Sequence, residues 1–263
     1  METNSHISSE RGIYRLRRII EQSNILVLSD RTKAIEVAFE SFLENRRQLV
    51  DYIRFHPEYE YSLIPLEVEL SAPRVAKIAA EASKNAEVGP MAAVPGALAD
   101  LALEEMMAVG ASVCLVENGG EVSARSCRPL RVGVYTGGTG LSGKFGFLLE
   151  QEDFPIGIST SSATVSHAIN FGQSDATVVF ADGAATADAA ATAVSNSVNG
   201  KDVTVSLHKG LNTAKGIRGV RGALIIRGEN VGTIGVMPKI LSVEGSLDEL
   251  FEADLYDTLP VKS

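Results

Sequence analysis

The sequence predicts an α+β fold with antiparallel sheets and packed helices. Three helical patterns follow one another between residues 32 and 109, whereas most of the expected strands form hairpins around short polar turns. Helices that cluster in the sequence and strands that occur as hairpins favour this class over a doubly wound parallel sheet. The 263 residues show no fixed-period repeat and no linker that would divide them, so we expect a single domain over residues 1–263.

Residues 1–70 are expected to form an N-terminal hairpin and a long helix. Apolar runs on both sides of a polar turn place the hairpin at residues 13–30. Apolar side chains then recur at helical spacing over residues 32–55, with Asp30 as the expected N-cap. The helix should end before Pro57, because the residue preceding a proline disfavours the helical conformation. A strand is expected near residues 63–68.

The middle of the chain continues with two helices and a series of apolar strands. Pro73 suits the first turn of a helix that extends to Ala86. A third helix should start near Gly96 and end at Gly110, which suits a C-cap. The expected strands in this part cover residues 113–116, 131–135, 145–149, 156–158 and 176–180.

The last part of the chain begins with a turn at Asp182 and Gly183 that leads into a helix over residues 184–198. Two strands, at residues 222–227 and 231–236, flank a short polar turn and form a hairpin. The tail, residues 244–263, is acidic and is expected to be peripheral.

Composition limits the compartment of the protein. Apolar residues make up 45% and charged residues 22% of the chain, as in an ordinary soluble protein. No segment approaches the roughly 20 apolar residues of a membrane span, and the N-terminus lacks the apolar segment of a signal peptide. Cys114 and Cys127 form neither a disulfide framework nor a zinc motif. We therefore expect a cytoplasmic protein with no membrane partner.

The charge balance limits the partners further. The formal net charge is −9 and the sequence pI is about 5.1. A protein that binds nucleic acid through phosphates needs an excess of basic side chains, and this chain has none. A small molecule is the expected partner, and exposed sheet edges would suit a homo-oligomer, although nothing in the sequence demonstrates one.

An alanine-rich helix over residues 187–193 carries a carboxylate and a hydroxyl at a spacing of four. Residues four apart lie on one face of a helix, so Asp188 and Thr192 point the same way. Such oxygen ligands suit Mg²⁺, which proteins hold with few side chains and with substrate phosphates. The alternative is a packed helix in which Asp188 stabilises the first turns, and the spacing alone favours this alternative.

Two further segments could contact a ligand. The strand over residues 113–116 leads into Asn118-Gly119-Gly120, which suits either a hairpin turn or a bare backbone against a planar ligand. Residues 157–164 contain five hydroxyl side chains after a strand, and they could bind phosphate or form a polar turn. His167 follows them and could act as a general base, although a lone histidine is more often structural.

Taken in order, four motifs resemble those of the ApbE-like superfamily, whose best-known members are Mg²⁺-dependent FAD:protein FMN transferases. Residues 91–100 look like the family's G-A-x-A-K-G-Y-A-x-D segment, and residues 118–121 look like its N-x-G-G-[DN] turn. Residues 160–162 stand where the family has a T-S-G step. Residues 187–193 are similar to its A-D-A-x-A-T-A helix, which is the most specific match.

The resemblance implies a T-fold-like ApbE fold whose ligand-site core covers residues 88–198. It implies that Asp188 and Thr192 bind Mg²⁺ together with the backbone carbonyl of Ala92. It also implies a flavin nucleotide, FAD or FMN, as the second cofactor. The implied cofactor-binding residues are Asp100, Asn118, Gly119, Gly120, Thr160, Ser161 and Ser162.

The sequence departs from the transferase pattern at several positions. Pro95 replaces the lysine of the first motif. The family's H-x-I-D-P-x-T-G element is reduced to His167 and Ile169, with Asn170 in place of the aspartate. The lipoprotein signal of exported transferases is also absent. The chain is most similar to an uncharacterised cytoplasmic branch of the superfamily, found in archaea and some bacteria.

The resemblance therefore turns the helix of Asp188 and Thr192 from a packing element into an expected site. We expect an Mg²⁺-dependent protein that binds FAD or FMN and acts as an FMN transferase or cleaves the FAD pyrophosphate, with His167 as the base. One alternative is a flavin-binding or cofactor-maturation protein without catalysis. Another is an enzyme that acts on a different phosphorylated or pterin-like metabolite.

Overall fold

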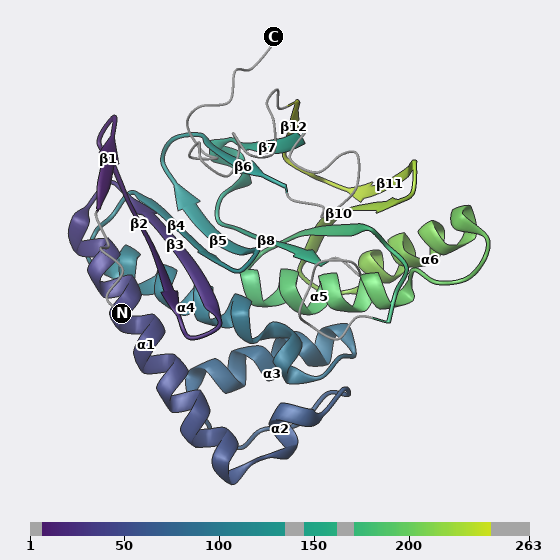
Figure 1. Ribbon diagram of the computed structural model, residues 1–263, viewed down its shortest axis with the longest axis horizontal. Helices are drawn as coiled ribbons and strands as arrows, with labels where there is room; N and C mark the ends of the chain where they lie inside the picture. Colours follow the sequence, from purple (N-terminus) through teal and green to yellow (C-terminus); the bar gives the residue numbers. More distant parts are fainter. Residues whose placement is uncertain (1–6, 135–144, 162–170, 243–263) are drawn as a thin grey trace.

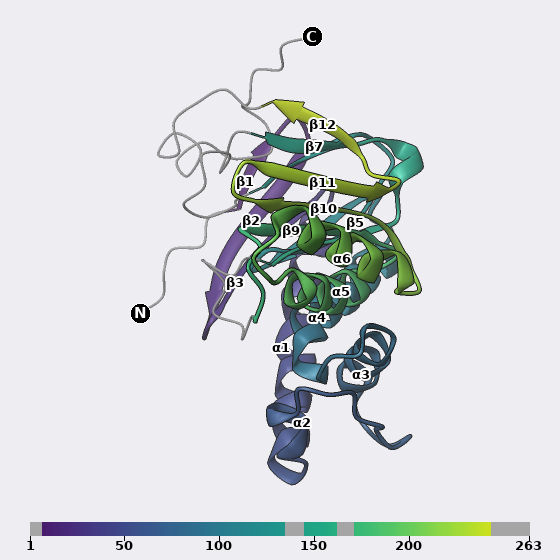
Figure 2. The same cartoon turned by 90° about the vertical axis from the view of Figure 1, so that its right-hand side faces the viewer.

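The computed structural model describes residues 7–134, 145–161 and 171–242 of the chain (Figure 1). Three layers are visible in Figure 2: a small sheet, a large sheet and a layer of helices. One apolar core lies between the large sheet and the helices, and a second lies between the two sheets. All strand pairs among the described residues are antiparallel, which confirms the predicted α+β class.

The large sheet has nine strands in the order β1-β2-β3-β4-β5-β8-β9-β10-β11. The pairs β1-β2, β2-β3, β4-β5 and β10-β11 are hairpins, whereas helices separate β3 from β4 and β9 from β10 in the sequence. Strand β5 pairs with β8, and the small-sheet strands β6 and β7 lie between them in the sequence. The strands are β1 (Ser8–Glu10), β2 (Ile13–Ile20), β3 (Ser23–Ser29), β4 (Val113–Asn118), β5 (Glu121–Ser126), β8 (Ile156–Ser161), β9 (Ala176–Ala181), β10 (Val220–Arg227) and β11 (Asn230–Gly235).

The small sheet covers the face of the large sheet that is turned away from the helices. Its order is β12-β7-β6, with β6 at Leu130–Gly133, β7 at Phe145–Leu149 and β12 at Lys239–Ser242. The rings of Phe147 on β7 and Phe180 on β9 meet edge to face, with their centroids 4.8 Å apart. Since β9 packs against both other layers, all six of its residues are buried.

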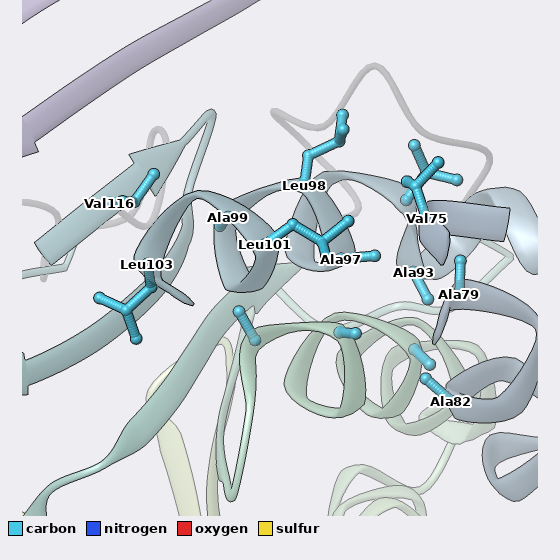
Figure 3. Close-up of a cluster of buried hydrophobic side chains, with 14 of the residues drawn as sticks. Val75, Ala79, Ala82, Ala93, Ala97, Leu98, Ala99, Leu101, Leu103 and Val116 are labelled. Atoms are coloured by element: carbon cyan, nitrogen blue, oxygen red, sulfur yellow. The ribbon is translucent and has the colours of Figure 1, made fainter. Parts of the chain in front are cut away.

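The helical layer is centred on α5, an alanine-rich helix that packs on β8 and β9 and is surrounded by α3, α4 and α6. Alanine side chains allow such close neighbours, and Ala79, Ala82 and Ala97 in Figure 3 come from helices that pack on α5. The helices are α1 (Thr32–Phe55), α2 (Glu58–Tyr61), α3 (Arg74–Ala86), α4 (Val94–Ala108), α5 (Ala184–Ser197) and α6 (Val203–Gly216), with short 3-10 turns η1 (Pro90–Ala93) and η2 (Gln151–Asp153).

Two local predictions are wrong. No strand forms over residues 63–68, which follow the short helix α2 as irregular backbone. Pro65 has no N–H to give to a ladder, and the Ser62 hydroxyl bonds both the N–H and the carbonyl of Ile64 instead. Asp30 is also not the N-cap of α1, because Arg31 holds that position and makes no side-chain cap bond.

The carboxylate of Asp30 connects two elements instead of capping one. Its Oδ1 accepts hydrogen bonds from the backbone N–H groups of Ser112 and Val113, both at 3.1 Å. The start of β4 is thereby tied to the end of β3 beside the first turn of α1. Among the described residues, no helix combines the length and the apolar character that a membrane span requires.

Candidate functional site

The first turn of α5 is held by a carboxylate from α4. The Oδ1 atom of Asp100 accepts hydrogen bonds from the N–H of Ala184 at 2.9 Å and from the hydroxyl of Ser123 at 2.6 Å. Its Oδ2 atom accepts the N–H of Ala185 at 2.9 Å. These N–H groups have no partner within the helix, so Asp100 supplies the missing acceptors. We call Asp100, Ser123 and Ala184 the capping rung.

Asp188 lies one turn further along α5 and is nearly buried, with 8% of its surface exposed. Its Oδ2 atom accepts the N–H of Gly96 at 3.0 Å. Burial raises the pKa of Asp188 well above its usual value, the charge of Glu121 raises it further, and the Gly96 bond opposes both effects. Asp188 therefore faces α4 and the strand that carries Glu121.

Glu121 faces Asp188 because the side-chain repeats of β5, α4 and α5 have similar lengths along the three elements. Glu121 and Ser123 are two residues apart on β5 and share a face, and Gly96 and Asp100 share a face of α4. Two residues of strand cover about 6.6 Å, and four residues of helix cover about 6 Å. Two residues along β5 and four residues along α4 and α5 from the capping rung lie Glu121, Gly96 and Asp188. We call these three residues the carboxylate rung.

The Glu121 carboxylate is enclosed between the sheet and the helices. The hydroxyl of Ser159 on β8 donates to its Oε1 atom at 3.4 Å. Burial raises the pKa of Glu121 to about 8, and the Ser159 bond lowers it only in part. Among the described residues, a hydroxyl and backbone N–H groups donate hydrogen bonds to Glu121 and Asp188. In the same part of the chain, neither carboxylate has a lysine or arginine partner.

The segment Asn118-Gly119-Gly120 is a two-residue hairpin turn between β4 and β5, with Asn118 opposite Glu121 in the register. Gly119 and Gly120 have φ angles of +72° and +124°, which residues with a side chain rarely adopt. The side-chain amide of Asn118 donates to the carbonyl of Pro95 at 3.1 Å. The turn therefore joins α4 to the sheet and carries Glu121 into the carboxylate rung.

Thr192 lies on α5 with Asp188, and Ala92 lies on a 3-10 turn that packs against this helix. Thr192 is half-buried one helical turn beyond Asp188, and η1, which contains Ala92, packs against α5. The backbones of α4 and α5 touch at this end, since a Cβ added to Gly96 would lie 2.3 Å from the carbonyl oxygen of Ala184. The three residues implied as metal ligands are thus carried by neighbouring elements.

The hydroxyl residues on β8 divide between the two faces of the large sheet. Ser161 shares its face with Ser159, which contacts Glu121, whereas Thr160 pairs with Val178 on the face that packs on the small sheet. The Thr160 side chain therefore points away from Asp188. Ser162 and His167 lie outside the described residues.

The donor set fits a small, hard cation. A buried aspartate, a half-buried glutamate, a hydroxyl and a backbone carbonyl offer only oxygen, which Mg²⁺, Mn²⁺ and Ca²⁺ prefer. A divalent cation would balance the charge of a carboxylate pair that has no basic partner among the described residues. In that part of the chain, no group of three or more His, Cys, Asp or Glu residues is placed to hold a metal.

Glu121 is the residue of this arrangement that the sequence alone does not single out. It stands at the last position of a glycine turn. The alternation of Glu121 and Ser123 along β5 is the feature that could have identified it, because two polar side chains on one face of a buried strand need partners.

Solved structures share the fold. The flavinyl transferase ApbE of Pseudomonas stutzeri is 16% identical with a TM-score of 0.55, over 84% of this chain and 94% of that chain. The ApbE protein of Thermotoga maritima is also 16% identical with a TM-score of 0.55, over 82% and 97%. At these identities, the likeness establishes the architecture.

Sequence comparison establishes the family. A UPF0280 protein of Methanothermobacter thermautotrophicus is 40% identical over 77% of this chain and 78% of its own length. The UPF0280 protein MJ1526 of Methanocaldococcus jannaschii is 35% identical over 91% and 98%. The family model described as AbpE bacteria matches residues 5–214. The chain is therefore a member of this ApbE-like family, to whose archaeal UPF0280 proteins it is similar over most of its length.

Proposed function

We propose that this protein binds a flavin nucleotide, FAD or FMN, together with Mg²⁺ at the carboxylate rung. The observation that carries the proposal is the buried carboxylate of Asp188. The backbone N–H of Gly96 on α4 donates to it at 3.0 Å, and the carboxylate faces Glu121. A cation would stabilise the ionised form of a carboxylate in this setting, and a nucleotide diphosphate is a natural co-ligand for Mg²⁺.

The flavin part of the proposal is supported by the fold. The solved structures that resemble this chain include proteins described as flavinyl or flavin transferases, from Pseudomonas stutzeri and Vibrio cholerae. The motifs at residues 118–121 and 187–193 lie on β4, β5 and α5, where the carboxylate rung forms. Asn118 and the two turn glycines present bare backbone next to Glu121 of the carboxylate rung, which suits the approach of a planar ring.

The proposed reaction is transfer of FMN from FAD, or hydrolysis of the FAD pyrophosphate. A hydroxyl or water oxygen forms a bond to the flavin-side phosphorus, the bond to AMP breaks, and His167 takes the proton of the attacking group. Bound Mg²⁺ would supply charge neutralisation at the diphosphate. Asp188 and Thr192 would hold the cation with the Ala92 carbonyl, and the Gly96 N–H fixes the orientation of Asp188.

The test is a titration of FAD against the full chain, in Mg²⁺ and again with a chelator. We expect binding that needs Mg²⁺ and that Asp188→Ala weakens at least tenfold, because a carboxylate that binds the cation is removed. Glu229→Gln is the control, since it removes one negative charge from an exposed turn far along the chain. Absence of FAD and FMN binding under all conditions would contradict the proposal.

A second candidate is a flavin-binding or maturation protein without catalysis. Pro95 and Asn170 stand where the transferase motifs have lysine and aspartate, so groups that the reaction needs could be missing. Release of AMP from FAD separates the two candidates, because only an enzyme produces it. Mass spectrometry of ligand retained through purification would reveal a different phosphorylated or pterin-like metabolite.

A further inference from the structure

The second carboxylate of the carboxylate rung has no assigned role. We infer that Glu121 completes the cation site of Asp188 from the strand side, so that this chain binds a divalent cation before any nucleotide is present. The inference deepens the proposed function and rests on its placement of the cation at Asp188. It concerns the order of binding and the ligand set, neither of which follows from Asp188 and Thr192 alone.

The first step is the position of Glu121. The capping rung fixes β5, α4 and α5 relative to one another through three hydrogen bonds to Asp100 of 2.6–2.9 Å. The carboxylate rung lies two residues away on β5 and four residues away on α4 and α5. Glu121 on the sheet and Asp188 on the helix therefore point into the same small volume. Two carboxylates that approach from opposite layers can bind one cation between them.

The carboxylates of Asp188 and Glu121 differ from that of Asp100 in how fully hydrogen-bond donors engage them. Both oxygens of Asp100 are engaged by N–H and hydroxyl donors, so this carboxylate is satisfied by the fold itself. Asp188 and Glu121 are less fully engaged: the Gly96 N–H donates to Asp188 at 3.0 Å, and the Ser159 hydroxyl donates to Glu121 at 3.4 Å beside a bond from the backbone N–H of Glu121 itself. A carboxylate accepts several bonds when it is ionised, so the pair retains acceptor capacity toward a ligand.

The third step is the number of ligands. A site of one aspartate, one threonine and one carbonyl is weak, and such a site depends on substrate phosphates to hold Mg²⁺. A second carboxylate raises the charge and the number of oxygen ligands, which are the features that increase divalent cation affinity. With Glu121 included, the protein itself supplies four oxygen-bearing groups.

The experiment is a titration of the metal-free full chain with Mn²⁺, followed by electron paramagnetic resonance, without nucleotide. We expect one bound Mn²⁺ per wild-type chain and at least a tenfold loss of affinity in Glu121→Gln and in Asp188→Asn. Glu229→Gln should bind as the wild type does. Glu121→Asp, which keeps the charge on a shorter side chain, should give an intermediate affinity.

Circular dichroism and thermal melts show whether each variant is folded, and Glu121→Asp provides the answer if Glu121→Gln does not fold. Absence of Mn²⁺ binding to wild-type protein, or unchanged binding in a folded Glu121 variant, would overturn the inference. Mn²⁺ binding with the expected losses but without any flavin binding would remove the proposed function alone. Mg²⁺-dependent FAD binding that is unaffected by Glu121→Gln would remove this inference alone.

Discussion

At the scale of single residues, Asp100 and Asp188 show how the same side chain serves two purposes. They lie on adjacent helices. Gly96, which donates to Asp188, is one turn from Asp100, and Ala184, which donates to Asp100, is one turn from Asp188. Asp100 accepts three hydrogen bonds from α5 and β5, whereas Asp188 accepts the N–H of Gly96 and faces Glu121. The three bonds indicate that Asp100 stabilises the fold, and the smaller number of donors at Asp188 supports the ligand role proposed for it.

Replacement of Asp100 tests this distinction. In Asp100→Asn, the side-chain NH₂ must face at least one of the donors from Ala184, Ala185 or Ser123, so one bond becomes a repulsive contact. We expect a loss of about 1–3 kcal/mol in the free energy of unfolding, measured by urea denaturation. The Mn²⁺ affinity of the folded variant should change much less than it does in Asp188→Asn.

Ser123→Ala is the matched control for Asp100→Asn, because it removes one donor and leaves the carboxylate in place. It should cost about 1 kcal/mol. A stable Asp100→Asn variant that fails to bind ligand would instead make Asp100 a direct contact, as the family resemblance implies.

The residues of the site could be predicted from the sequence only where the signal is local. Asp188 and Thr192 are four apart on one helix, so their common face follows from helix geometry. The partners of Asp188 come from far away: Gly96 lies 92 positions earlier, and Glu121 arrives through a hairpin. Such contacts depend on how α4, β5 and α5 align, and no spacing along the chain encodes that alignment.

At the scale of elements, the contact between α4 and α5 depends on a glycine. A Cβ on Gly96 would lie 2.3 Å from the Ala184 carbonyl oxygen and 2.7 Å from the N–H nitrogen of Ala185. Both neighbours are backbone atoms, so the helices would have to separate. Because the Gly96 N–H also orients Asp188, a separation would reach the carboxylate rung.

Gly96→Ala should therefore destabilise the fold by about 1–3 kcal/mol, as overpacking does in well-packed cores. It should also weaken Mn²⁺ binding, because the N–H donor moves away from Asp188. Urea denaturation and the Mn²⁺ titration measure the two effects.

Gly216→Ala provides the opposite control. Gly216 ends α6, is exposed and has no atom within 4 Å of an added Cβ, so alanine should stabilise the protein by roughly 0.4–1 kcal/mol. Equal effects of the two substitutions would contradict the role of close packing at Gly96.

Element types were predictable where a pattern repeats and poorly predictable where tertiary contacts decide. The helix over residues 32–55 has the predicted limits, because its apolar spacing and the following proline define both ends. The helix α6 was missed, since only four of its 14 residues are buried and its polar surface hides the period. The apolar residues near 63–68 suggested a strand, but they have no neighbouring strand to pair with.

At the scale of the whole molecule, the proposed site and the periphery differ in how they are held. The carboxylate rung draws on β5 of the large sheet and on α4 and α5, which pack directly on that sheet. Loss of the rung therefore requires the central layers to separate. The connector between α2 and α3, residues 62–73, lies at the end of the molecule away from the sheets, as Figure 2 shows for α2.

The connector should open without the rest of the fold. Leu70 is 95% exposed and Ile64 is 68% exposed, and regular structure is absent from residues 62–73. Ser62 is fixed more tightly, because its carbonyl oxygen leaves no room for a Cβ on Gly89. We therefore expect chymotrypsin to cleave the native protein after Leu70, since cleavage needs only local opening there.

The measurement is mass spectrometry of fragments from brief digestion, with and without saturating Mn²⁺. Bound Mn²⁺ would stabilise the global fold by mass action, so it should slow cleavage that depends on global unfolding and leave the Leu70 cut unchanged. Leu70→Ser should remove that fragment and keep Mn²⁺ affinity. If the Leu70 cut appears only as urea unfolds the whole chain, the connector is part of the same cooperative unit as α5. The stability of the proposed site would then extend to the far end of the molecule.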